Sequence, residues 1–353
     1  GTYLQAKFHF PVPELAMVFV LMTFPMAVIF LISRITARQF ESLFVHSWRS
    51  ARAKRYSLAI VLACTAALIA LEWPLTASFS QLYDIRANTN SRFFNLSAYL
   101  SGSLASALVP ALAFLAGVFR DAKLALVSIS IAFLIIFAAG IKGHLAYTGF
   151  ALFLGIIWSA GVWQRVYKYL FLGASLFYVL ILYEGFPSDL AEYVFRRIFI
   201  VPGVGVGAHL ELLNYEYADQ FSILFGLDSD TPITYLVGNV IYEIENNNAN
   251  TIGFVHAYGS GGLWSYFFAV AIAGAYFFVL NLVYSRTGSP LSLVAGFLFA
   301  VIIIEQSVFT AMLSSGMAVL LLIVCLQNRK LINRQQKFDV KTKPDNHRYR
   351  SAQ

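Results

Sequence analysis

The sequence predicts an all-α, polytopic membrane protein, and two observations carry that prediction. Of its 353 residues, 59% are hydrophobic and only 12% are charged, with a mean hydropathy of +0.68. A soluble domain carries roughly 25% charged residues, about twice this share. Several apolar runs also reach the roughly 20 residues that a helix needs to cross hydrocarbon. Cys64 and Cys325 lie inside such runs, so we interpret both as buried apolar side chains rather than a disulfide or metal pair.

Hydropathy predicts about nine spanning helices with one large loop between the sixth and the seventh. We expect N-terminal helices over 1–184, an external loop over 185–258, C-terminal helices over 259–326 and a basic tail over 327–353. The individual spans are expected at residues 14–33, 57–77, 97–119, 124–141, 145–163, 169–184, 259–283, 290–304 and 308–326.

Lys and Arg are divided unequally between the two sides that these spans define. Nineteen of the 25 lie in one set of loops and in the tail, which the positive-inside rule places in the cytoplasm. The tail is then an orientation signal near anionic lipid, and the net charge of +7 does not indicate nucleic-acid binding. Residue 1 falls outside, which leads us to expect a further helix before it. The six bases of the outer side are Lys7, Arg86, Arg92, Lys142, Arg196 and Arg197.

The outer loop concentrates charge in a way that orientation does not require. Nine of the chain's 18 acids lie within 185–258, and only Arg196 and Arg197 oppose them. The stretch 188–201, SDLAEYVFRRIFIV, predicts an amphipathic helix along the interface. Arg196 alone has the spacing to pair with Glu192. Two adjacent guanidinium groups, however, are suited to gripping phosphate oxygens, so we expect a phosphate clamp.

Other ionisable groups fall at outer helix ends. Lys142 and His144 share a short turn, although a lysine at a helix end often serves only to reach the interface. Together with the arginines they would surround one anionic group. Glu72 and Glu305 also lie at outer ends, and acids at membrane depth are functional candidates. Because no metal-ligand spacing and no phosphate-binding glycine loop is present, we expect neither a metal nor a cofactor.

The stretch NNNANTIGFVHAYGSGG, residues 246–262, precedes an apolar run. Asparagine tolerates turns, and Asn250 or Thr251 would cap the following helix. Capping uses one or two such residues, whereas this stretch adds His256 and Tyr258 to a cluster of amides. Uncharged hydrogen-bonding groups beside aromatic rings suit a polyhydroxylated ligand, and a sugar is the natural candidate.

At these residues the sequence resembles bacterial oligosaccharide repeat-unit polymerases, the Wzy-type O-antigen polymerases. NANTIGFVHAYGSGG resembles their Asn-x-Asn-Thr-Gly-Phe pattern, with Ile252 interrupting the Thr-Gly step. FRRIFIVPG resembles their arginine motif, and Arg196 and Gly207 fit its Arg-x10-Gly spacing. Lys142 stands where the pattern leads us to expect arginine. The resemblance covers about residues 140–320, and the N-terminal third matches by hydropathy alone.

The resemblance implies a metal-independent glycosyltransferase of the inner membrane that works at the periplasmic face on undecaprenyl-pyrophosphate-linked repeats. Its partners would be those lipid-linked oligosaccharides, membrane lipids, a flippase and a chain-length regulator. The pyrophosphate-binding residues would be Arg196, Arg197, Lys142 and His144, and the glycan-binding residues Asn250, Thr251 and Tyr258. Candidates for the catalytic base are His256, Glu72, Glu243 and Glu245, in no order.

Three rival functions remain open from the sequence, and one of them is a non-enzymatic membrane assembly subunit, whose external loop would need no cationic cluster. An O-antigen ligase shares substrate and architecture but transfers the glycan to lipid A. A transporter or flippase of lipid-linked glycans is a different class, and transporters place their binding groups near the bilayer midplane, often within inverted repeats. Here the ionisable groups lie at outer helix ends and no repeat is detectable, which favours the enzyme.

Overall fold

The computed structural model describes residues 12–40, 51–71, 96–139, 143–162, 205–209, 237–241 and 252–326, with positions 172 and 175. Within these ranges every regular element is a helix, and the only β contact is an isolated bridge between Gly253 and Ser307. The all-α prediction is therefore confirmed for the described part of the chain. The elements are α2 (Val12–Phe40), α3 (Ala51–Leu71), α5 (Leu96–Ser103), η3 (Leu104–Leu108), α6 (Val109–Phe119), α7 (Ala122–Ala139), α8 (Gly143–Ser159), η5 (Val237–Ile241), α14 (Gly253–Thr287), α15 (Pro290–Glu305) and α16 (Val308–Met312).

Two of these helical segments are long and apolar enough to cross a membrane, judged by length and composition. They are Tyr99–Phe119, which runs through α5, η3 and α6, and Gly261–Ser285 within α14. Shorter apolar helices of 10–17 residues lie over the other expected spans, except 169–184, of which only positions 172 and 175 are described. The shorter helices are Phe19–Arg34, Ser57–Leu71, Ala122–Ala138, His144–Ser159, Pro290–Glu305 and Met317–Leu326.

The first long segment stays helical through a proline because it contains a π turn. Pro110 has no N–H and its ring crowds the carbonyl of the preceding turn. Directly before it, residues Leu104–Leu108 form a π-helix, and the N–H of Val109 bonds to Leu104 O, five residues back. The wider turn carries the chain past the proline without ending the helix.

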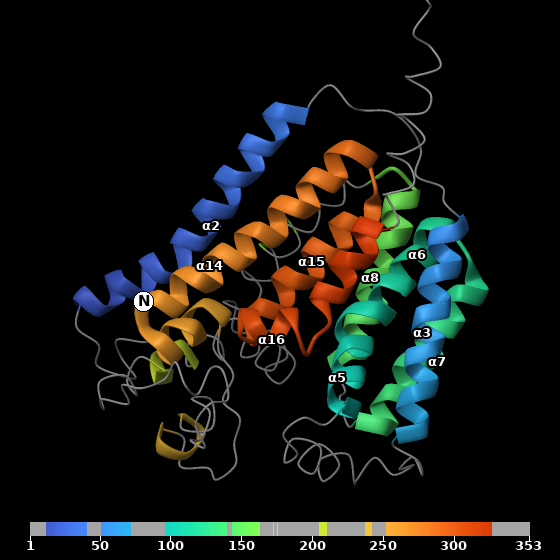
Figure 1. Ribbon diagram of the computed structural model, residues 1–353, viewed down its shortest axis with the longest axis horizontal. Helices are drawn as coiled ribbons and strands as arrows, with labels where there is room; N and C mark the ends of the chain where they lie inside the picture. Colours follow the sequence, from blue (N-terminus) through green and yellow to red (C-terminus); the bar gives the residue numbers. More distant parts are fainter. Residues whose placement is uncertain are drawn as a thin grey trace, which may run out of the picture.

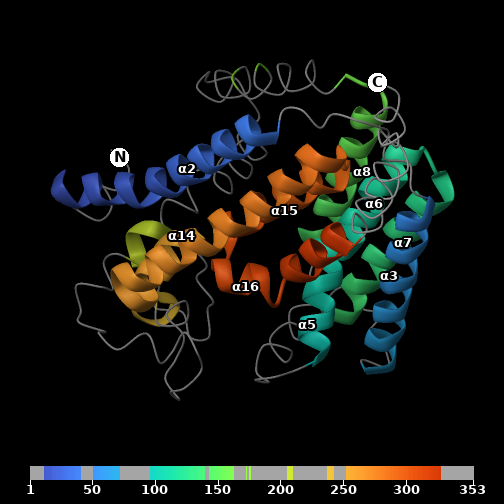
Figure 2. The same cartoon turned by 45° about the horizontal axis from the view of Figure 1, so that its top comes forward.

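Helices α2 and α14 lie side by side and run in the same direction (Figure 1), and a second view agrees (Figure 2). Two hydrogen bonds join them in register. Tyr266 Oη donates to Leu21 O at 3.0 Å, and Asn281 Nδ2 donates to Ser33 O at 3.1 Å. Polar side chains that bond a neighbouring backbone are a usual link between apolar helices. The charge pattern predicts that both helices run from the outer side to the cytoplasmic side, and a shared direction is what that prediction requires.

Helices α6 and α8 touch backbone to backbone at two glycines. A Cβ built on Gly117 would lie 2.4 Å from Leu152 O, and one on Gly155 would lie 2.2 Å from Phe114 O. Both distances are far inside van der Waals contact, so only glycine fits at either position. Apolar helices gain no hydrophobic free energy by associating in lipid, so close packing through small residues supplies much of their attraction.

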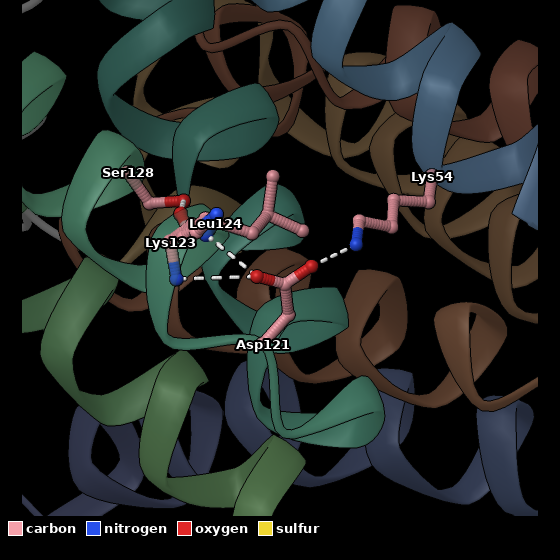
Figure 3. Close-up of polar contacts among 5 residues, drawn as sticks. All are labelled: Lys54, Asp121, Lys123, Leu124 and Ser128. Carbon is pink, nitrogen blue, oxygen red and sulfur yellow. Dashed lines mark hydrogen bonds and ion pairs between the residues drawn. The ribbon is translucent and has the colours of Figure 1, made fainter.

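Asp121 joins three helices at the end that the charge pattern places in the cytoplasm (Figure 3). Its carboxylate forms an ion pair with Lys54 of α3. Its Oδ1 also accepts hydrogen bonds from the N–H groups of Lys123 and Leu124, both at 3.1 Å, and so caps α7. A negative charge at a helix N-terminus is favourable. Arg120, with φ of 52°, ends α6 just before it.

The expectation of one unbroken helix over 308–326 is wrong. Helix α16 ends at Met312, residues 313–315 form a turn, and a new helix begins at Met317. Gly316 has a φ of 73° and approaches Ser103 so closely that an added Cβ would lie 2.7 Å from the serine Cβ. Neither the left-handed backbone nor the close contact with a distant helix is visible in the apolar pattern of the segment.

The glycine contact gives a prediction with its control on the same helix. Gly155→Ala should destabilise the protein by about 1–3 kcal/mol, because overpacking forces α6 and α8 apart. Gly149→Ala should be neutral or slightly stabilising, because nothing lies within 4 Å of the place where its methyl group would sit and alanine favours a helix. The measurement is thermal unfolding of the purified protein in detergent. Equal unfolding temperatures for the two variants would contradict the close contact.

Candidate functional site

The motif stretch of residues 246–262 leads into a short helix that is separate from the long apolar segment. Helix α14 begins at Gly253, earlier than the expected start at residue 259, and its N-cap is Ile252 without any side-chain cap. Ile252, and not Asn250 or Thr251, holds the N-cap position, and both of those residues lie outside the described part of the chain. Gly261 (φ −170°, ψ 23°) and Gly262 (φ 61°, ψ −151°) leave helical geometry. Residues 253–260 thus form a unit of their own, which carries His256 and Tyr258.

Gly253 holds the start of this short helix against the turn between α15 and α16. It bridges to Ser307, and an added Cβ would lie 2.5 Å from Gln306 O. The turn is itself well defined, because Ser307 caps α16 by accepting a bond from the N–H of Thr310 at 3.0 Å. The glycine of the motif is therefore required by a close approach, and this approach places the motif beside Glu305.

Glu305 also receives a contact from the start of α8. Tyr147 Oη donates to Glu305 Oε2 at 3.2 Å, and the rings of Tyr147 and His144 meet edge to face with centroids 5.5 Å apart. His144 was expected at this end of the bundle, whereas Tyr147 was not singled out. Its spacing of three from His144 on one helix face was the available signal.

A second histidine, His209, lies beside His256. Their ring centroids are 6.1 Å apart, and His209 is fully buried at 0% exposure. Its Nδ1 is 2.8 Å from Gly205 O, within a helical turn over residues 205–209. Sequence reasoning missed His209, because an isolated histidine after a run of glycines carries no spacing signal. Its importance follows only from contact with a residue that is distant in the sequence.

Burial keeps both imidazoles neutral. Burial lowers the pKa of His209 to about 4, although the bond to Gly205 acts in the opposite direction. Burial, and then the nearby His209, lowers the pKa of His256 to about 3. A base works best when its pKa lies near the operating pH. This low basicity counts against His256 as the catalytic base while its ring stays buried.

Most of the other predicted site residues lie outside the described part of the chain. Tyr258 is described, and it is half-buried against the hydrophobic core, as is Ile252. Among the described residues, no three His, Cys, Asp or Glu side chains gather in a way that would hold a metal ion. The predicted residues outside the description are Glu72, Lys142, Arg196, Arg197, Glu243, Glu245, Asn250 and Thr251.

These contacts bring together four segments at one end of the described helices. They are the start of α8, the α15–α16 turn, the short helix 253–260 and the turn 205–209. Comparisons of the sequence with models of protein families, with curated proteins and with solved structures found no match.

The histidine pair predicts a defined loss of stability in acid. Both folded-state pKa values lie below the ordinary 6.5, so below pH 6.5 the unfolded chain binds more protons than the folded one. Stability should be complete above pH 6.5 and should fall toward pH 4, with His209 alone contributing a loss of about 2 kcal/mol at pH 5. Thermal unfolding in detergent across this range measures it. A His209→Asn, His256→Gln double variant that keeps the full slope would contradict the assignment.

Proposed function

We propose that this chain is a membrane glycosyltransferase of the inner membrane that joins undecaprenyl-pyrophosphate-linked oligosaccharide repeats at the periplasmic face. The observation that carries the proposal is the meeting of the polymerase-like motif with three other segments at one end of the helices. Gly253 packs against the α15–α16 turn, Tyr147 bonds Glu305 of that turn, and His256 lies beside His209.

A chain that crosses the membrane about nine times is part of this proposal, and the exposed side chains support it. Trp264 is 84% exposed, Phe19 69% and Leu126 67%, and they lie on three different helices. Apolar surface of this extent would aggregate in water, whereas lipid tails accept it. Contacts between elements also pair ends assigned to the same side, such as Lys54 with Asp121 and Tyr147 with Glu305.

The proposed reaction depends on which bond supplies the free energy for glycan transfer. No ATP is available outside the cytoplasm, so the lipid pyrophosphate has to be the leaving group. The hydroxyl oxygen of the incoming repeat attacks the anomeric carbon, the bond from that carbon to the pyrophosphate breaks, and the hydroxyl proton passes to a base. Cations fixed at the interface stabilise the charge on the departing pyrophosphate.

Residue roles in this proposal come from the motif resemblance. Arg196 and Arg197 hold the pyrophosphate, with Lys142 and His144 beside them. Asn250, Thr251 and Tyr258 hold glycan hydroxyls. Since His256 is a weak base here, the proton passes to one of the carboxylates Glu72, Glu243 and Glu245. The reaction needs no metal ion.

The arginine pair provides the test of this function. Arg196→Ala and Arg197→Ala should each slow glycan lengthening by about 10²–10³, the usual cost of losing one fixed donor to developing charge. Arg→Lys should recover part of the rate, because a point charge lacks the bidentate fork. The measurement is the length ladder that purified protein forms from lipid-linked repeats.

Lys123→Ala is the matched control, because this exposed cation lies at the opposite end of the helices. Its ladder should equal that of the unmodified protein. Normal ladders from both Arg196→Ala and Arg197→Ala would contradict the role of these arginines in binding pyrophosphate. Glycan transferred to lipid A without any lengthening of lipid-linked chains would identify a ligase instead.

A further inference from the structure

His209 contains a buried polar atom for which the described part of the chain provides no hydrogen-bond partner. Its Nε2 has no hydrogen-bond partner among the described residues, and its side chain is fully buried. Buried polar groups in folded proteins are nearly always hydrogen-bonded, so an exception calls for an explanation. The neighbouring ring of His256 does not supply one, since the centroids are 6.1 Å apart and tilted by 46°.

The chemical state of this atom follows from the other ring nitrogen. Nδ1 lies 2.8 Å from Gly205 O, and a carbonyl oxygen only accepts hydrogen bonds, so Nδ1 carries a proton. Burial keeps the ring neutral, because it lowers the pKa to about 4. A neutral imidazole has one N–H, and Nε2 therefore presents a lone pair. The atom is a fixed acceptor that requires a donor.

We propose that His209 Nε2 accepts a hydrogen bond from a hydroxyl group of the glycan bound at the outer helix ends. The inference rests on the proposed function and assigns a binding residue that the motif does not contain. A lone pair disfavours the oxygens of a pyrophosphate, which are acceptors themselves. His209 therefore contacts the sugar part of the substrate and not its phosphate part. It is a specificity-determining residue for a free hydroxyl.

The position of His209 agrees with this role. His256, its neighbour, lies on the short helix 253–260, and that helix continues from the amide-rich part of the motif. Gly253 fixes one end of the helix against the α15–α16 turn, and the glycines at 261–262 separate its other end from the long segment. The unpaired acceptor thus lies beside the segment that resembles a glycan-binding motif.

Two substitutions distinguish the roles of the two ring nitrogens of His209. In His209→Gln the side-chain amide reaches the position of Nε2 and provides an acceptor oxygen there. In His209→Asn the shorter amide reaches only the position of Nδ1 and keeps the bond to Gly205. Both variants are made in the full-length chain, purified in detergent and assayed with lipid-linked repeats. Unfolding temperature is recorded for each, so that loss of fold is recognised.

The acceptor role predicts that His209→Asn raises KM for the incoming repeat about tenfold or more, the effect of one lost bond of about 1.4 kcal/mol. His209→Gln should restore much of this affinity, and kcat should keep its pH profile in both. If Nε2 bonds only a water molecule, KM will not change in either variant. A fall in kcat with unchanged KM in both variants would make His209 a base. Either result overturns the proposal.

A binding measurement keeps this inference distinct from the proposed reaction. The repeat oligosaccharide, freed of its lipid pyrophosphate by mild acid, is titrated into protein labelled with ¹⁵N-histidine. His209→Gln identifies the His209 signal by its loss. A saturable shift of the Nε2 resonance on titration supports the acceptor role. If the protein then forms no glycan ladder, only the polymerase assignment fails. An unmoved resonance in a protein that does make ladders overturns the inference and leaves the polymerase standing.

Discussion

Our proposal places these helices in hydrocarbon, where each backbone N–H and C=O has to find its partner within the protein, and that constraint accounts for most of the described structure. It explains why the described elements are helices, and why a π turn carries the chain past Pro110 where a break would leave carbonyls unpaired. Polar side chains such as Tyr266 and Asn281 bond to the backbone of a neighbouring helix. Among the described residues, Lys54, Asp121 and Glu305 lie at or near helix ends.

The sequence predicted the positions of the apolar helices because each depends on a local run of residues. It did not predict the interruption at 313–316, which depends on the approach of Gly316 to Ser103, or the close contact of Gly155 with Phe114. The structure places His144 against Tyr147, at the end where Tyr147 meets Glu305, and its predicted role stays a prediction. His209 was missed, because only the fold brings it beside His256.

The two ends of the helices differ in chemistry. At one end the carboxylate of Asp121 forms an ion pair with Lys54 and also caps α7. These contacts pair the carboxylate and link α3 to α7. At the other end the groups are neutral imidazoles, a tyrosine and an exposed glutamate, and His209 Nε2 has no hydrogen-bond partner within the described part of the chain. A satisfied cluster stabilises the fold, whereas an unsatisfied one is available to a ligand.

The central claim, that the end carrying His144, Glu305 and His256 faces outward, is tested most directly by cysteine labelling in whole spheroplasts. Cys64 and Cys325 are first replaced by alanine. Glu305→Cys, at the exposed last residue of α15, then marks one end, and Lys123→Cys marks the other. An impermeant maleimide should label Glu305→Cys in intact spheroplasts and Lys123→Cys only after permeabilisation. The reverse pattern would place the site in the cytoplasm and contradict the account.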